Sequence, residues 1–242
     1  MSRTVADAIV ACLKQEGVEV IFGIPGEENI RLVMALEGSG IRFILTRHEQ
    51  AAAFMADMYG RLTGRAGVCT ATLGPGAINL LLGVADATTD STPLVALTAQ
   101  VGLNRIYRES HQSVDLVAMF RPVTKWADIV LTPQSVPEMV RKAFSLACSE
   151  RPGATYLAIP QDIEAAPAPP RLHTPARNAL PRSRPRRRPH RRGRDTPEDC
   201  ETTRHSRRTR CRPCTRIGCA RKAVGSPERA RRDDIHGQGG HT

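Results

Sequence analysis

Apolar positions along residues 1–160 fall into two alternating patterns. Apolar residues three or four positions apart predict helices from Thr4 to about residue 16 and at 30–36, 51–62, 77–87, 114–120 and 136–148. Short apolar runs between them predict buried strands at 20–22, 41–45, 67–72, 94–98, 126–131 and 154–159. The alternation predicts an α/β fold, a doubly wound parallel sheet with helices on both faces.

Charge divides the chain near residue 170. Residues 171–242 hold 21 of the 35 Lys and Arg and 7 of the 24 Asp and Glu, which leaves 14 basic and 17 acidic residues in 1–170. Residues 171–242 also contain no Phe, Trp or Tyr, and such a segment buries too little apolar surface to offset its chain entropy. We predict a folded domain at 1–168 and a disordered, Arg- and Pro-rich tail at 169–242.

Targeting and membrane signals do not stand out in the sequence. The first residues do not have the pattern of a secretory signal, and apolar runs stay below the roughly 18 residues that a membrane span needs. The seven cysteines are an odd number and lack the spacing of a disulfide framework. The sequence predicts a cytoplasmic protein with reduced thiols and no membrane partner.

Ligands of parallel sheets bind in the loops at the carboxyl ends of the strands. Two of these loops, Gly23-Ile24-Pro25-Gly26 and Gly74-Pro75-Gly76, are rigid and carry few side chains, which lets a flat group approach the backbone. Taken alone, the first is more often a plain tight turn. The second resembles a phosphate-binding turn but lacks the Lys-Ser/Thr of a P-loop, which argues against nucleotide binding. Asn79 either presents its amide to a ligand or bonds the start of the next helix.

Polar side chains in two further loops are candidates for chemistry. Glu49 begins a helix, where an acid also complements the helix dipole, but the apolar residues 51–55 that follow are expected to keep its carboxylate partly dry. His111 and Gln112 precede an apolar helix. Two interpretations of His111 are equally good: an exposed residue beside a helix cap formed by Ser113, or a residue of a binding site. For Gln112 we favour a place in the binding site.

The order of the loops is more specific than any one of them. The blocks GIPGE, RHEQAAAFMA, GRLTGRAGVCTATLGPGAINL, STPLVALTAQ, HQSVD and PVTKW together resemble the amino-terminal, pyrimidine-binding domain of the acetolactate synthase family of thiamine diphosphate enzymes. The resemblance runs from about Thr4 to Gln161. HQSVD with PVTKW is more similar to the catabolic, flavin-free enzymes than to the biosynthetic ones. Related carboligases and decarboxylases share the first three blocks, so the superfamily is better defined than the substrate.

This resemblance implies roles for particular residues. Glu49 would hydrogen-bond N1′ of the cofactor's aminopyrimidine ring and favour the imino tautomer, whose nitrogen removes the thiazolium C2 proton. His111 and Gln112 would lie on the substrate side. Residues implied to contact the ring are Ile24, Pro25, Gly26, Pro75 and Asn79, together with Glu49.

The same resemblance implies a larger enzyme. Pyruvate, a 2-oxo acid, would be decarboxylated and ligated to give 2-acetolactate in a homo-oligomer. The cofactor's diphosphate would be held through Mg²⁺ by a domain absent from this chain, so no metal ligand is expected here and the chain alone would be inactive. The alternatives are the pyrimidine-domain subunit of a two-subunit thiamine diphosphate decarboxylase and a non-catalytic, basic nucleic-acid-binding protein.

Three interpretations compete for the tail. Arg182 to Arg194 is dense in arginine, as in a nucleic-acid-binding arm, but has no aromatic residue for stacking on bases. A zinc site could use Cys200, Cys211, Cys214 and Cys219, and Cys211 and Cys214 have the right C-x2-C spacing. However, no apolar pair surrounds this motif and the fourth ligand is poorly placed. We therefore expect the tail to bind neither a specific nucleic acid nor a metal ion.

The third interpretation is a shift of reading frame. With codons chosen for residues 201–211, translation from one nucleotide later reads KRPVILAGHG, and with codons chosen for 233–242 the same offset reads TTFMGKGVI. Both strings resemble the middle domain of acetolactate synthase, in the order found there. We favour this interpretation and place the slip near residues 180–184.

Overall fold

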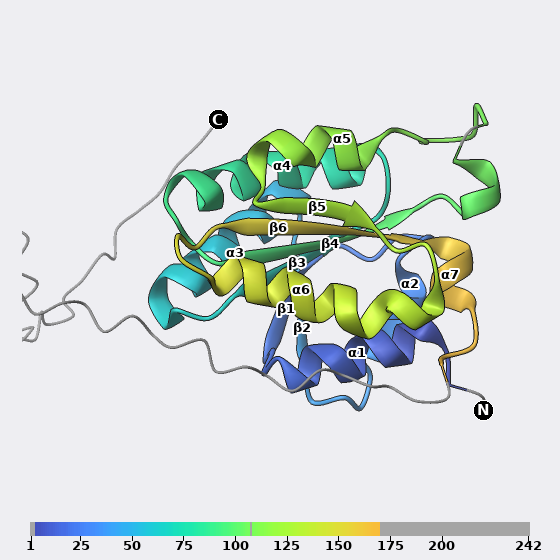
Figure 1. The fold of residues 1–242 in the computed structure, drawn as a ribbon, viewed down its shortest axis with the longest axis horizontal. Coiled ribbons are helices and arrows are strands. Elements are labelled where there is room, and N and C mark those ends of the chain that lie inside the picture. Colours follow the sequence, from blue (N-terminus) through green and yellow to red (C-terminus); the bar gives the residue numbers. More distant parts are fainter. Residues whose placement is uncertain (1–2, 107, 170–242) are drawn as a thin grey trace, which may run out of the picture. The chain divides into compact units, whose positions relative to one another are not determined.

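A six-stranded parallel sheet forms the centre of the protein. The computed structural model describes residues 3–106 and 108–169. Its strands are β1 (Val20–Gly23), β2 (Arg42–Leu45), β3 (Gly67–Ala71), β4 (Leu94–Gln100), β5 (Trp126–Ile129) and β6 (Ala154–Pro160). All neighbouring pairs are parallel. The predicted α/β fold class is therefore confirmed (Figure 1).

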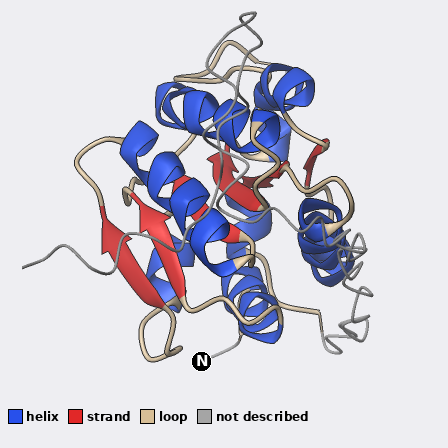
Figure 2. Cartoon of the chain, turned by 90° about the vertical axis from the view of Figure 1, so that its left-hand side faces the viewer, coloured by secondary structure: helices blue, strands red, loops and turns tan. Residues whose placement is uncertain are grey.

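Helices connect and cover these strands on both faces (Figures 1 and 2). They are α1 (Val5–Gln15), α2 (Ile30–Ala35), α3 (Glu49–Thr63), α4 (Pro75–Thr89), α5 (Leu116–Phe120), α6 (Val136–Cys148) and α7 (Gln161–Ala165). One hydrophobic cluster joins the sheet to α1, α2, α6 and α7, and a second joins it to α3, α4 and α5. Neighbouring strand residues alternate between the clusters, since Val68 belongs to the first and Cys69 to the second.

The order of the strands creates a switch point in the sheet. The order is β2-β1-β3-β4-β6-β5, so the chain passes outward from β1 to β2 and then returns to add β3 on the other side of β1. The connection after β1 leads to α2 on one face, and the connection after β3 leads to α4 on the other. Loops that diverge in this way leave room for ligands at the carboxyl ends of the strands.

Small residues let α3 and α4 pack closely together and against the sheet. The buried surface of α3 consists of Ala52, Ala53, Ala56, Asp57 and Gly60. A Cβ placed on Gly83 of α4 would lie 2.6 Å from Cβ of Ala53, and one placed on Gly67 would overlap the carbonyl of Ala56. The close packing fixes where α3, which begins at Glu49, lies relative to β3 and α4.

Three features differ from the sequence predictions. The strand β2 lies at the sheet edge and is largely accessible, with Leu45 65% exposed, rather than buried. The helix expected from residue 114 begins at Leu116 instead, because Asp115 rather than Ser113 caps it by accepting a hydrogen bond from Ala118 N at 2.9 Å. The short helix α7 was not predicted, since five residues show no clear period.

The tail lies outside the described residues. The frame shift that we favour there stays a prediction, and the two less favoured interpretations, a zinc site and a nucleic-acid arm, are likewise untested. Within the described part of the chain, no helix is long and apolar enough to cross a membrane.

Candidate cofactor site

The loop after β1 is fastened by a buried asparagine. Asn29 is 2% exposed; its Oδ1 accepts from Gly26 N at 2.6 Å and its Nδ2 donates to the carbonyl of Ile24 at 3.1 Å. These bonds hold the turn with Pro25 exposed at its tip. The predicted contact residues of this loop thus share one rigid turn at the carboxyl end of β1.

The start of α3 places Glu49 at the neighbouring strand end. Thr46, which follows β2, donates from Oγ1 to the carbonyl of His48 at 3.1 Å, and His48 Nδ1 accepts from Gln50 N at 3.1 Å. His48 is therefore the helix cap, which leaves the half-buried Glu49 side chain free for other contacts. The apolar surface that follows Glu49 is smaller than the sequence predicts, because Ala52 and Ala53 are buried but Phe54 and Met55 are exposed to solvent.

The loop after β3 meets the Glu49 carboxylate. Asn79, in the first turns of α4, donates from Nδ2 to Glu49 Oε2 at 2.9 Å. A Cβ placed on Gly76 would lie 3.4 Å from the other oxygen, Oε1, so the glycine leaves that oxygen uncrowded. Pro75 is exposed at the first position of the helix. Glu49, predicted from one block, thus neighbours Pro75 and Asn79, predicted from another, and Gly76, which was not among the predicted contact residues, lies with them.

The segment with His111 and Gln112 reaches the same loop through Gln112. Gln112 has a φ of 57° and Gly74 a φ of 55°, both in the left-handed region. A Cβ on Gly74 would lie 2.6 Å from the carbonyl oxygen of Gln112, so only glycine allows this approach. The side chains of both His111 and Gln112 are exposed. The backbone of Gln112 therefore contacts the turn at Gly74. His111 forms no hydrogen bond or ion pair with the described residues.

The PVTKW block has a structural explanation. Lys125 Nζ donates to the carbonyl of Leu146 and to Ser149 Oγ at 2.7 Å, and so caps the carboxyl end of α6. Burial lowers the pKa of Lys125. Lys125 of this block therefore holds the carboxyl end of α6 in place.

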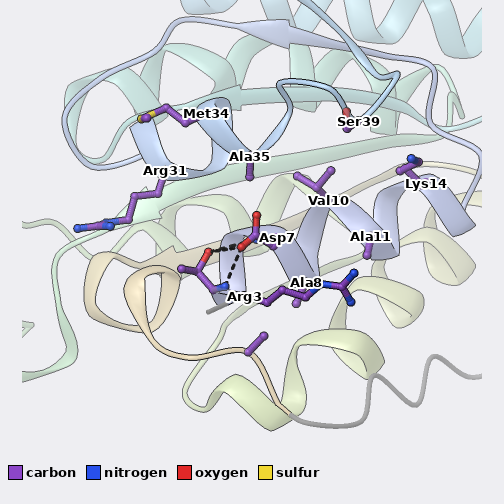
Figure 3. A pocket seen from close by; sticks show the side chains of 12 residues that line it. Arg3, Asp7, Ala8, Val10, Ala11, Lys14, Arg31, Met34, Ala35 and Ser39 are labelled. Carbon is purple, nitrogen blue, oxygen red and sulfur yellow. Dashed lines mark hydrogen bonds between the residues drawn. The ribbon is translucent and has the colours of Figure 1, made fainter. Parts of the chain in front are cut away.

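A separate groove of about 740 Å³ lies between α1 and α2 (Figure 3). Arg3, Lys14 and Arg31 lie on its rim, and Asp7 near its centre bonds Thr4. None of its lining residues belongs to the loops around Glu49. Within residues 3–106 and 108–169, no group of three or more His, Cys, Asp and Glu could hold a metal ion.

Comparison with known proteins explains this arrangement of loops. Residues 3–119 match the family described as thiamine pyrophosphate enzyme, N-terminal TPP binding domain. They belong to this family. Thiamine pyrophosphate is another name for thiamine diphosphate, which is therefore the cofactor that the domain implies.

Relatives of this thiamine pyrophosphate enzyme domain extend the match beyond residue 119. The chain is 44% identical over 159 residues to a probable acetolactate synthase large subunit of Methanocaldococcus jannaschii, covering 66% of this chain and 27% of that protein. It is 45% identical over 163 residues to a catabolic acetolactate synthase of Raoultella terrigena, covering 67% and 29%. It is 40% identical over 167 residues to a probable 2-ketoarginine decarboxylase of Pseudomonas aeruginosa, covering 68% and 30%. The chain thus spans less than a third of these relatives.

Sequence reasoning missed the residues that hold the domain's loops together. Thr72 directly follows β3, Gln100 is the last residue of β4, and Asn29 directly precedes α2. Gln100 is 4% exposed, donates from Nε2 to the carbonyl of Val114 at 3.1 Å and accepts from Val101 N at 2.9 Å. Thr72 and Gln100 stand inside the recognised blocks, so a polar residue at a buried strand end was the available signal for them. Asn29 lies two residues after the GIPGE block.

Proposed function

We propose that this domain binds the aminopyrimidine end of thiamine diphosphate and that the Glu49 carboxylate hydrogen-bonds its N1′ atom. The observation that carries the proposal is the position of that carboxylate, with Oε2 fixed by Asn79 and Oε1 beside Gly76. When bound, the cofactor supplies the electron sink that decarboxylation of a 2-oxo acid requires.

The surrounding residues suit a flat heteroaromatic ring. The turns at Ile24-Pro25-Gly26 and at Pro75 offer backbone groups and little side-chain bulk, because each is built from glycine and proline. Asn79 restricts rotation of the Glu49 carboxylate, so the group needs little reorganisation when it accepts a proton or a hydrogen bond. The residues present therefore fit the pyrimidine part of the cofactor.

The reaction that we propose is acetolactate synthesis from pyruvate. It is supported by the names of the archaeal and Raoultella relatives and by the HQSVD block, whose Gln112 backbone packs on Gly74. We assign His111 and Gln112 to the substrate side of the site, because both are exposed at the same sheet edge.

The other half of the site is proposed to come from further polypeptide. This assignment is supported by the short span of the chain along its relatives. The missing part would hold the diphosphate and Mg²⁺, within a homo-oligomer, and the chain by itself would be inactive. Exposed apolar side chains on α3, at Phe54, Met58 and Leu62, recur every four residues and are suited to such a contact.

The experiment is a titration of the 242-residue chain with 4-amino-5-hydroxymethyl-2-methylpyrimidine, the free form of the ring, followed by backbone amide NMR. Binding should shift the amides of Gly26, Glu49 and Gly76. Glu49→Gln should weaken binding by roughly tenfold or more, because a hydrogen bond to a charged group contributes about 1.5–3 kcal/mol.

The matched control is Glu138→Gln, which replaces an exposed acid in the first turn of α6. It should bind the ring as the unmodified chain does. Equal affinity of the Glu49→Gln and Glu138→Gln variants would remove Glu49 from the proposed role.

A further inference from the structure

We propose that Thr72 and Glu28 form a positioning pair that sets the distance between the two ring-binding loops and thereby aims the Glu49 carboxylate. The inference rests on the proposed function, because it assumes that these loops bind the aminopyrimidine. Neither residue is expected to touch the ring.

Thr72 lies between the two loops at the switch point of the sheet. It follows β3 directly, and β3 is the neighbour of β1. A Cβ placed on Gly26 would lie 2.8 Å from Cβ of Thr72, and one placed on Gly76 would lie 2.8 Å from its Cγ2. The side chain thus contacts the loop after β1 on one side and the start of α4 on the other.

Glu28 fastens the first loop to this threonine. Thr72 Oγ1 donates a hydrogen bond to Glu28 Oε2, across 44 residues of sequence. Glu28 adjoins Asn29, whose side chain bonds Gly26 N and the carbonyl of Ile24. The bond therefore ties the whole turn 24–29 to the end of β3.

The same packing continues from Thr72 to the Glu49 carboxylate. The Cγ2 methyl of Thr72 sets the position of Gly76, and Gly76 lies beside Glu49 Oε1. Asn79, three residues further along α4, holds the other oxygen, Oε2. A shift of Gly76 moves the N-terminal turn of α4 and with it both contacts of the carboxylate. Thr72 consequently acts on the ring site through its hydroxyl on one side and its methyl on the other.

Two variants of Thr72 separate the hydroxyl from the methyl group. Thr72→Val keeps the shape and removes the bond to Glu28. We expect it to bind the free aminopyrimidine about tenfold more weakly, which corresponds to the loss of one partly buried hydrogen bond of about 1.4 kcal/mol. Thr72→Ser keeps the hydroxyl but removes the methyl contact with Gly76, so it should bind about threefold more weakly, a smaller loss than in Thr72→Val. Glu28→Ala should weaken binding of the aminopyrimidine as much as Thr72→Val does. The double variant should bind hardly more weakly than either single variant, because both remove the same hydrogen bond.

The control is Thr89→Val, since the Thr89 hydroxyl is exposed and, among the described residues, bonds the carbonyl of Ala85 one turn earlier. A second measurement needs no ligand: hydrogen exchange at the Gly26 amide, which bonds Asn29, should accelerate in Thr72→Val and not in Thr89→Val.

The outcomes separate this inference from the proposed function. Absence of ring binding by the unmodified chain would overturn the proposed function and, with it, the positioning role toward the ring. Ring binding that is equally tight in Thr72→Val and Thr89→Val would overturn the positioning pair alone. Unchanged Gly26 exchange in Thr72→Val would overturn the tie between the loops whether or not the ring binds.

Discussion

Single polar side chains at strand ends determine the geometry of the site. Thr72 and Gln100 each bond a loop from a more distant part of the chain, and Asn29 bonds the loop that directly precedes it. Buried polar groups that find partners in this way make one loop conformation better than its alternatives. Glu164 is different, because one of its oxygens accepts from Leu32 N at 2.6 Å while the other, Oε2, finds no hydrogen-bond partner among the described residues.

Glu164 should make stability depend on pH. The group is 2% exposed, and burial raises its pKa from 4.5 to about 7, against the opposing effects of Leu32 N–H and of Arg31. The folded state therefore disfavours the ionised form, and stability falls as pH rises from 4.5 through 7. Glu164→Gln should have a larger free energy of unfolding than the unmodified chain near pH 8, by up to about 3 kcal/mol.

Chemical denaturation at several pH values checks this prediction. The difference between Glu164→Gln and the unmodified chain should vanish below pH 4.5, where the carboxyl is neutral in both states. Replacing an exposed acid of the adjoining turn, Glu37→Gln, should give no comparable pH-dependent gain. A constant difference across the whole pH range would show that ionisation of Glu164 does not cause the effect.

At the scale of elements, periodicity predicted where helices and strands lie, but not how they are ordered. Val136–Cys148 has the predicted bounds because its apolar positions recur with the helical period. The edge position of β2 and the order β4-β6-β5 could not be predicted, since packing between distant segments selects them. The loops around Glu49 were found because their blocks resemble a family. The bond between Thr72 and Glu28 was missed because no local pattern encodes a contact between residues 44 apart.

The close contact of α3 with β3 gives a prediction at this scale. A Cβ on Gly67 would overlap the backbone carbonyl of Ala56, which cannot move without shifting α3. Gly67→Ala should lower the free energy of unfolding by about 3 kcal/mol or more, at the upper end of overpacking effects. Gly64→Ala is the comparison, because Gly64 has a φ of 67° and open space around it, so it should cost only about 1–2 kcal/mol. Equal losses in thermal or chemical unfolding would contradict the steric explanation.

At the scale of the whole molecule, the described domain is one half of the proposed catalytic unit. The proposed ring site lies at the carboxyl edge of the sheet, with Glu49, Asn79 and the two turns as its proposed contacts. The cofactor's diphosphate needs charged or metal-bound partners, and the proposed function assigns these to polypeptide beyond the domain. Binding of the ring and turnover of substrate should therefore be separable properties of this chain.

The 242-residue chain should form no measurable 2-acetolactate from pyruvate when thiamine diphosphate and Mg²⁺ are supplied. The reason is that a ring contact through Glu49 positions one end of the cofactor only, and decarboxylation requires the thiazolium to be held against the substrate as well. A colorimetric assay of acetoin, formed from acetolactate in acid, measures this, with the full-length acetolactate synthase of Bacillus subtilis, 42% identical over 158 residues, as the positive control. The amide shifts on adding the free aminopyrimidine establish in the same sample that the domain is folded. Turnover that is abolished by Glu49→Gln would show that the chain contains a complete site and would refute the division of the cofactor between two polypeptide segments.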